Sequence, residues 1–367
     1  MGKLDALLEE GERAGVFPLA RACVLVRGNK VWEGGNTPAD TVFDLASITK
    51  VMATTALALT LKLELTAPLR SLLPTARAGH VTLEDLLFHR SGLSAFLPFF
   101  EKAVRHAPQL FDADCPAHLR AVVRQGVVEH VLATPPIRGP GEATVYSDLG
   151  FILLGEAICA AAGAPLDALF AQHVARPLGL AAQYRRVSAA HPLPPSLAPT
   201  GNTRPREPAP GQEGLWNVAP RPTLPGEVDD DNAWCLDGVS GHAGLFATAG
   251  DVARFGQAVL DGTFAPPVPW RRDPVTAGST RALGFDTPSD EASSCGSRFG
   301  RAGPRGSIGH LGFTGTSLWI DLDRQLVVAL CTNRVALGRA NLAIREFRPR
   351  FHDAVLDALS STGEKAP

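Results

Sequence analysis

The spacing of hydrophobic and polar positions predicts a helix and then a β-hairpin at the start of the chain. Residues 3–15 place leucines among acidic positions in the manner of an amphipathic helix. Residues 21–27 are largely apolar, Gly28-Asn29 supplies a turn, and residues 30–33 form the returning arm. A hairpin of two strands is too small to be stable alone, so this one needs further strands beside it.

The end of the chain shows a similar pattern in the reverse order. Residues 317–321 and 325–332 predict a second hairpin that turns at Asp323-Arg324, and a helix follows over 341–359. We expect the two hairpins to join in one antiparallel sheet, because that arrangement gives each of them partners. The terminal helices would then flank this sheet.

Between the hairpins, the apolar positions recur at helical spacing. Helices are predicted at 47–63, 81–89, 117–134 and 149–179, the last broken by Gly163 and Pro165. Pro, Gly, Arg and Asn then dominate residues 191–232, which predicts a long irregular loop of a kind that is commonly functional.

These elements predict an α/β (α+β) fold with two lobes. Residues 1–65 and 236–367 are expected to form an α/β lobe that contains the antiparallel sheet. Residues 66–235 are expected to form an inserted, mainly helical lobe that includes the Pro/Gly-rich loop. A cleft between the lobes is the default position for a functional site.

Composition narrows the function classes. The chain has 367 residues, 45% of them hydrophobic, and a formal net charge of -2, which gives no global field for nucleic acid or an anionic membrane. The acidic first helix is unlike a signal peptide, and no apolar stretch is long enough to span a bilayer. Six scattered cysteines without metal-ligand spacing indicate reduced, buried thiols. We expect a cytoplasmic monomer that binds a small-molecule substrate, with no metal, nucleic-acid or membrane partner.

The first candidate for chemistry is Ser47 with Lys50. Three residues apart on a helix, their side chains share one face, and an amine there can take the proton of a serine nucleophile. The start of the helix adds positive potential for a developing oxyanion. The Ser-x-x-Lys pattern alone is weak evidence, because about one such match is expected by chance in a chain of this length.

Two later stretches add further candidates. Tyr146 lies just after a Gly-Pro-Gly turn and could pass a proton to a leaving group, or it could be a core tyrosine with Asp148 capping the next helix. Residues 309–316 are rich in glycine, so their backbone could approach a ligand and donate an N–H to an oxyanion. The alternative is an ordinary bulged start of a strand.

The order and approximate spacing of three motifs resemble those of the penicillin-recognising serine hydrolases. The motifs are Ser47-Ile48-Thr49-Lys50, Tyr146-Ser147-Asp148 and His310-Leu311-Gly312. The chain looks most like the branch that holds class C β-lactamases, serine esterases, D-aminopeptidases and DD-peptidases. The resemblance runs from about residue 3 to 359, and residues 82–93 and 241–248 are similar to two further segments of that branch.

This resemblance implies a β-lactamase/transpeptidase-like fold and a set of residue roles. Ser47 would attack a carbonyl to give an acyl-enzyme, and Lys50 and Tyr146 would share the general base and acid work. The backbone N–H groups of Ser47 and Phe313 would form the oxyanion hole. Substrate binding would fall to Asp148, His310 and Gly312, and no metal or organic cofactor is implied.

The chain departs from the family pattern at two positions. Asp148 stands where the family often has Asn, and its carboxylate would favour the ammonium form of Lys50 and disfavour a tyrosinate, so the base stays open. His310 stands where β-lactamases and DD-peptidases usually carry Lys, and histidine is only partly charged near neutrality. That difference favours esters, or amides without a carboxylate. Phe313-Thr314-Gly315 is a rival register three residues on.

We assign the other conspicuous polar residues to structure. His89 is expected to close a helix, His242 is open between loop packing and lining the cleft, and residues 229–231 are expected to form a solvated acidic turn. The predicted function is acyl hydrolysis of an ester, amide or β-lactam. The alternatives are a penicillin-binding or sensor protein that is acylated without turnover, and a structural descendant without chemistry.

Overall fold

A computed structural model describes residues 2–112, 114–189, 191–201, 203–206, 218–264, 270, 272–289, 293–300 and 306–361. The two hairpins lie in one antiparallel sheet of seven strands in the order β2-β1-β12-β11-β10-β9-β8. Val24 of β1 lies opposite Val328 of β12, so the predicted joining of the hairpins is confirmed. The strands are β1 (Ala20–Val26), β2 (Asn29–Gly35), β8 (Arg281–Ala282), β9 (Phe285–Asp286), β10 (Ser307–Leu311), β11 (Ser317–Asp321) and β12 (Leu326–Thr332).

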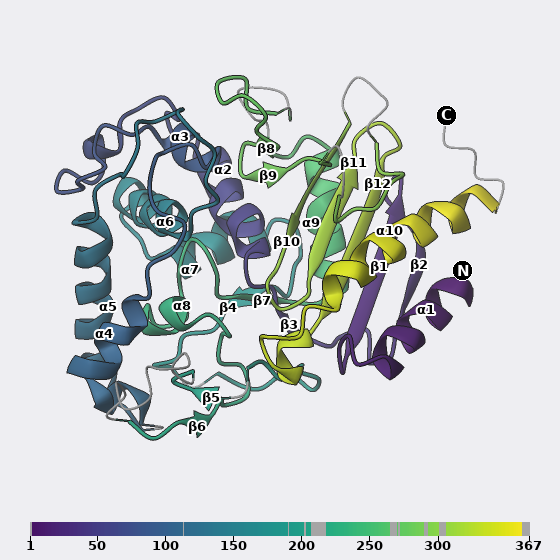
Figure 1. Cartoon of the computed structure of the whole chain (residues 1–367), viewed down its shortest axis with the longest axis horizontal. Helices are drawn as coiled ribbons and strands as arrows, with labels where there is room; N and C mark the ends of the chain where they lie inside the picture. The colour runs from purple at the N-terminus through teal and green to yellow at the C-terminus, as the bar shows by residue number, and fades with distance from the viewer. Residues whose placement is uncertain are drawn as a thin grey trace.

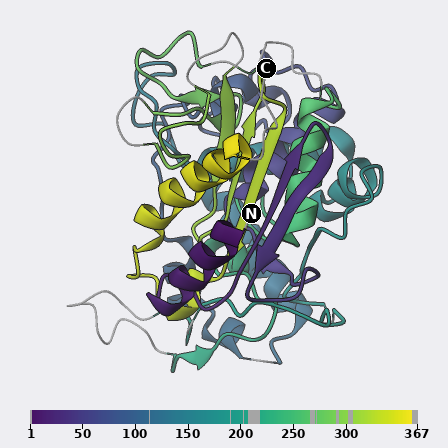
Figure 2. The ribbon, with the colours of Figure 1, turned by 90° about the vertical axis from the view of Figure 1, so that its right-hand side faces the viewer.

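Helices cover both faces of this sheet (Figures 1 and 2). The terminal helices α1 (Gly2–Arg13) and α10 (Ile344–Ser361) pack on one face, and α9 (Ala249–Leu260) packs on the other. Alternation along the strands explains this layering, because successive side chains point to opposite faces. Val24 and Val328 join the hydrophobic cluster of the terminal helices, whereas Val327 joins the cluster that contains α9.

The middle of the chain forms a mainly helical lobe beside the sheet (Figure 1). Its helices are α3 (Leu83–Leu87), α4 (Phe99–His106), α5 (Ala117–Leu132), α6 (Asp148–Ala162), α7 (Leu166–Phe170) and α8 (Asp231–Cys235). Two smaller sheets are also present: β3 (Phe43–Asp44), β7 (Leu245–Ala247) and β4 (Gln183–Tyr184) form one, and β5 (Thr203–Arg204) pairs with β6 (Arg221–Pro222) in the other. The predicted fold class is therefore confirmed.

The helix after Ser47 differs in detail from the prediction. It winds as a π-helix over Lys50–Thr55, continues as α2 (Ala56–Thr60), and ends three residues before the expected position 63. Lys62 takes a positive φ of 51°, a conformation that ends a helix. The first hairpin likewise turns at Arg27-Gly28, where both φ angles are positive as a type I′ turn requires, one residue earlier than predicted.

One large hydrophobic cluster runs through both halves of the molecule. It includes Phe255 of α9, Leu57 of α2 and Phe151 of α6, so α2 is packed between the sheet side and the helical lobe. The lobe limits at residues 65/66 and 235/236 stay a prediction.

Among the described helices, no single helix is long and apolar enough to cross a bilayer. The bent pair Asp148–Ala162 and Leu166–Ala175 meets the length and composition criteria only when the two helices are taken together.

Packing of α9 on the sheet yields the first prediction. A Cβ on Gly256 would lie 2.5 Å from Val327 Cγ1 and 3.1 Å from Leu318 Cδ1, and the valine is stiff at χ1. Gly256→Ala should therefore lower the free energy of unfolding by about 1–3 kcal/mol, as overpacking does. The control Gly126→Ala in α5, where nothing lies within 4 Å, should raise it by about 0.5–1 kcal/mol. Urea unfolding measures both, and a stabilised Gly256→Ala protein would contradict this packing.

Candidate active site

Ser47 is presented by a strained connection between β3 and the helix that follows. Ala46, directly before it, has a φ of 46°, which is unusual for a residue with a Cβ and is often found at functional sites. The Ala46 N–H donates to Asp44 Oδ1 at 2.8 Å, which holds this conformation. Burial raises the pKa of the Asp44 carboxyl to about 7, and the nearby Asp229 and Asp230 act in the same direction.

Lys50 is fully buried and donates three hydrogen bonds. Its Nζ lies 3.0 Å from Ser47 Oγ, 2.7 Å from Asp148 Oδ1 and 3.0 Å from the His242 carbonyl oxygen. An ammonium group has three protons, so all of them are used. Burial lowers the pKa of Lys50, but Asp148 and Tyr146 together outweigh it, and the pKa is raised. The predicted approach of Ser47 and Lys50 is therefore present, and Lys50 is held as the ammonium that Asp148 favours.

Tyr146 lies against the same group. Its ring centroid is 4.9 Å from Lys50 Nζ, and its hydroxyl is near enough to Lys50 and Ser47 for both to act on its pKa. Burial raises the pKa of Tyr146, Asp148 adds to this, and the opposing effect of Lys50 is smaller. The resting side chain is therefore a phenol. His89 stacks on its ring at 4.6 Å and accepts the Ser147 N–H at 3.0 Å, which fits the expected structural role of His89.

Two backbone N–H groups at the site lack an acceptor among the described residues. Within the part of the chain that the structure describes, neither Ser47 N–H nor Phe313 N–H has a protein hydrogen-bond partner. These are the two groups that the resemblance implies for an oxyanion hole. Both residues line the same cavity, as do Tyr146 and His310.

The segment that carries Phe313 is tied to the Ser47 connection by two threonines. Thr314 Oγ1 donates to the Asp44 carbonyl oxygen at 2.7 Å, and Thr316 Oγ1 donates to the Leu45 carbonyl oxygen at 3.1 Å. A Cβ on Gly312 would lie 1.9 Å from Thr316 Oγ1 and 2.5 Å from the Leu45 oxygen, so only glycine allows this close approach.

His310 does not behave as the titrating cation that the sequence analysis expects. It lies on β10, only 3% exposed, and its Nδ1–H donates to the Leu311 carbonyl oxygen at 2.9 Å. Burial lowers its pKa well below the usual value, and the positive charges of Lys50 and Arg281 act in the same direction. His310 is therefore neutral near pH 7. The permanent cation nearby is Arg281, whose guanidinium carbon lies 5.1 Å from the Tyr146 ring centroid.

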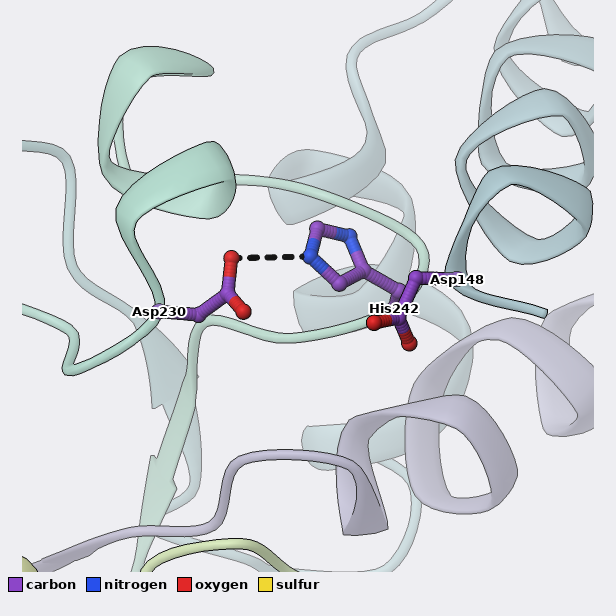
Figure 3. A group of neighbouring side chains, drawn as sticks. All are labelled: Asp148, Asp230 and His242. Carbon is purple, nitrogen blue, oxygen red and sulfur yellow. Dashed lines mark hydrogen bonds and ion pairs between the residues drawn. The ribbon is translucent and has the colours of Figure 1, made fainter. Parts of the chain in front are cut away.

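Asp148, Asp230 and His242 lie close together, with donor atoms within 4.8 Å of one another (Figure 3). These are residue types that bind metals, but their atoms already have partners. His242 Nε2 lies 3.0 Å from Asp230 Oδ1, its Nδ1 lies 2.7 Å from Ser240 Oγ, and Asp148 is paired with the Lys50 ammonium. A cation would face that ammonium, so the group does not fit a metal site. His242 is buried and is not among the described residues that line the cavity, which favours loop packing over lining the cleft.

The expectation of a solvated acidic turn at residues 229–231 is wrong. Asp229 and Asp231 are only 3% and 2% exposed, because arginines from distant segments cover them. Asp231 pairs with Arg204 and Arg206, and Asp229 Oδ2 pairs with Arg339 Nη2 at 3.0 Å. The Asp229 N–H also donates to Asp44 Oδ2 at 2.7 Å, so residues 229–231 help to hold Asp44 and with it the chain that leads to Ser47.

The cavity in front of Ser47 has a volume of about 1120 Å³ and an arginine-rich wall. That wall includes Arg206, Arg281, Arg334, Arg339, Arg345 and Arg348. Sequence reasoning missed these residues, because four separate segments supply them and no local motif marks them. The scarcity of lysine, which leaves arginine to supply most of the positive charge, was the one available signal.

This fold and the three motifs that line the cavity are those of the penicillin-recognising serine hydrolase superfamily. The family model described as Beta-lactamase matches residues 4–347, and the chain belongs to that family. It is 31% identical over 381 aligned residues to the N-acetylmuramyl-L-alanine amidase of Bacillus subtilis (strain 168), covering 90% of this chain and 80% of that protein. It is 29% identical to a putative D-alanyl-D-alanine carboxypeptidase of Escherichia coli (strain K12), covering 69% of this chain and 56% of that protein.

Among solved structures, the D-amino acid amidase from Ochrobactrum anthropi SV3 superposes with a TM-score of 0.67 at 18% identity. It covers 98% of this chain and 99% of that one, and this likeness shows the shared fold. The chain spans just over half the length of the carboxypeptidase relative. The family and the curated relatives make this protein a hydrolase of the Beta-lactamase family.

The threonine ties give a second prediction. Thr314→Val and Thr316→Val keep side-chain shape but each remove one buried hydrogen bond, so each should cost about 0.5–1.5 kcal/mol of unfolding free energy. Each should also slow reaction of Ser47 with a fluorophosphonate probe, because the Phe313 segment loosens. The exposed Thr263→Val serves as control and should change stability by less than about 0.5 kcal/mol. Unchanged stability and labelling in both variants would contradict the ties.

Proposed function

We propose that the protein is a serine acyl hydrolase in which Ser47 forms an acyl-enzyme with ester, amide or β-lactam substrates. One observation carries the proposal: Lys50 Nζ lies 3.0 Å from Ser47 Oγ beside two backbone N–H groups that lack an acceptor among the described residues. A nucleophile, a proton-transfer partner and two oxyanion donors on one cavity are what acyl transfer requires.

The resting charges suggest a path for the serine proton. Lys50 is an ammonium and Tyr146 a phenol, so neither is a free base at rest. The closest acceptor of Lys50 is Asp148, at 2.7 Å. Transfer of one proton to that carboxylate gives a neutral amine and a neutral acid, and the amine then takes the Ser47 proton as Oγ attacks the carbonyl carbon.

Collapse of the tetrahedral intermediate needs a proton for the leaving group. The Tyr146 hydroxyl, whose pKa responds to both Ser47 and Lys50, would donate it and then recover a proton from Lys50. Water then attacks the acyl-enzyme, and the same groups act in reverse to release the acid and restore Ser47. The N–H groups of Ser47 and Phe313 would stabilise both oxyanions.

The arginine-rich wall favours an anionic substrate. Arg281 lies beside Tyr146; its Nη1 lies 3.4 Å from Asp286 Oδ2, but its Nε has no partner among the described residues. The names of the curated relatives specify an N-acetylmuramyl-L-alanine amide and a D-alanyl-D-alanine end. We therefore favour an amide with a free carboxylate, recognised by arginine rather than by His310.

Replacement of the nucleophile tests the proposal directly. Ser47→Ala should fold with an unchanged melting temperature, yet give no adduct with a fluorophosphonate or boronate probe, because the attacking oxygen is gone. Intact-protein mass after probe treatment measures this. Wild-type labelling in the Ser47→Ala protein would remove Ser47 from the mechanism.

The pH profile of an Asp148 variant tests the proton path. Because the path passes a Lys50 proton to Asp148, Asp148→Asn should lower kcat/KM near neutral pH. Asp148 is also a main cause of the raised Lys50 pKa, so its loss should lower that pKa, and the remaining activity should rise with pH as the free Lys50 amine forms. Asp353→Asn is the control, since that carboxylate lines the same cavity without contacting Lys50. Wild-type kcat/KM and an unchanged pH profile in Asp148→Asn would contradict the transfer of the Lys50 proton to Asp148.

Charge preference tests the role of Arg281. Loss of a charge-assisted hydrogen bond costs about 1.5–3 kcal/mol, so Arg281→Gln should lower kcat/KM for a carboxylate-bearing substrate about 10- to 100-fold, and change a neutral ester far less. Since His310 is neutral, the ratio of kcat/KM for the carboxylate-bearing substrate to kcat/KM for the neutral ester should not change between about pH 6 and 8. This should hold in the wild type and in His310→Gln. If this ratio rises as pH falls, and the rise is lost in His310→Gln, then His310 and not Arg281 recognises the substrate carboxylate.

One observation favours the second candidate, a protein that is acylated without turnover. Lys50 is already committed to three acceptors and is held as an ammonium, which disfavours activation of the deacylating water. A stoichiometric burst of product followed by a stable adduct would identify that function.

A further inference from the structure

A second cavity, of about 180 Å³, shares no lining residue with the Ser47 cavity. Its wall combines Arg120 of α5, Arg185 and Arg186 after β4, His191, and Arg221 of β6. We propose that this cavity binds a small, doubly charged oxyanion of the phosphate class. The site is independent of the proposed acyl hydrolysis.

Two of the four arginines are already neutralised by carboxylates. Arg221 donates two hydrogen bonds to the Glu227 carboxylate, of 2.6 and 3.0 Å. The two oxygens of that carboxylate also accept hydrogen bonds from the Trp234 Nε1–H and the Leu224 N–H. Arg186 makes a similar pair of 2.7 Å bonds to Asp167. Glu227 therefore has no capacity left for the other arginines of the cavity.

Arg120 and Arg185 are the two without a carboxylate partner among the described residues. Each is only 4% exposed. Arg120 Nη2 donates to the Leu110 carbonyl oxygen at 3.1 Å, but its Nη1 has no partner there. Arg185 has one long bond, from Nη1 to the Pro192 carbonyl oxygen at 3.4 Å. Burial lowers the pKa of both guanidinium groups, because removing a cation from water disfavours its charged form.

A buried cation without a counter-charge is costly, so this pair indicates an anion that the protein binds. Trp234, whose ring lies 4.7 Å from the Arg120 guanidinium carbon, offsets only part of that cost. Two uncompensated positive charges match a dianion better than a monocarboxylate. The planar guanidinium fork also suits phosphate geometry, since it can donate two parallel hydrogen bonds.

The shape of the cavity supports this ligand size. One water takes about 30 Å³ of liquid volume, so 180 Å³ leaves room for a tetrahedral oxyanion with its hydration. Gly226 forms part of the wall at a φ of +82°, and a Cβ there would lie 2.6 Å from Arg185 Nε. Glycine thus lets the backbone press against Arg185 and fix its guanidinium in the wall.

Thermal unfolding of the full chain in sodium phosphate, against sodium chloride at matched ionic strength, tests the proposal. A ligand present at about ten times its Kd should raise Tm by about 2 °C. Arg185→Gln should lose this rise, whereas the exposed Arg77→Gln of the same lobe should keep it. Equal shifts in phosphate and chloride, or a full phosphate shift in Arg185→Gln, would overturn the site.

Further arms separate the ligand source and the Ser47 cavity. A larger rise in Tm with glycerol 3-phosphate than with phosphate would indicate a phosphate group carried by a small molecule, whereas an equal rise with acetate would overturn the dianion preference.

Phosphate bound at this site should not slow fluorophosphonate labelling of Ser47. Labelling that slows in parallel with the rise in Tm would place the anion in the Ser47 cavity instead. If Arg185→Gln fails to fold, selenate soaked into wild-type crystals decides, because anomalous peaks confined to the Ser47 cavity would refute the proposal.

Discussion

The site depends on one physical constraint, the burial of the Lys50 ammonium. A cation taken fully out of water needs a counter-charge and an acceptor for each proton, or it would shift to its neutral form. The acceptors come from three places: Ser47 just before the helix of Lys50, Asp148 at the start of α6, and the His242 carbonyl before β7. Satisfying one charge therefore fixes the helical lobe against the sheet side of the cavity.

A second layer of polar contacts holds the nucleophile in place. Asp44 accepts N–H groups from Ala46 and Asp229, while its own carbonyl oxygen accepts from Thr314. The strained Ala46 is thus fixed from the acidic segment on one side and from the Phe313 segment on the other. Strain of this kind persists where the surrounding structure over-determines it, and here it leaves the Ser47 N–H free of any acceptor among the described residues.

The sequence predicted features that depend on local pattern. Helical spacing brought Ser47 and Lys50 together, alternation placed Val24 opposite Val328, and ordered motifs located Tyr146 on the same site. Each of these follows from a periodicity or a short motif. The lobe division and the catalytic roles stay predictions, because geometry alone does not test them.

What the sequence missed depends on contacts between distant segments. Asp229 and Asp231 are buried because Arg339 and Arg204 pair with them, and no local pattern around these aspartates indicates it. His310 loses its expected charge through burial near Lys50 and Arg281, which are far from it in sequence. Strands β8, β9 and β10 are short or rich in glycine, so alternation gave no signal for them.

The central claim is that Ser47 carries the acyl group during hydrolysis. The most direct measurement is an intact-protein mass spectrum taken at short times after mixing with nitrocefin, a p-nitrophenyl ester or a D-alanyl peptide. The account predicts a mass increase equal to the acyl group for at least one of these, localised to the Ser47 peptide and decaying as product appears. Turnover of a substrate with no adduct at any time, or with an adduct on another residue, would contradict it.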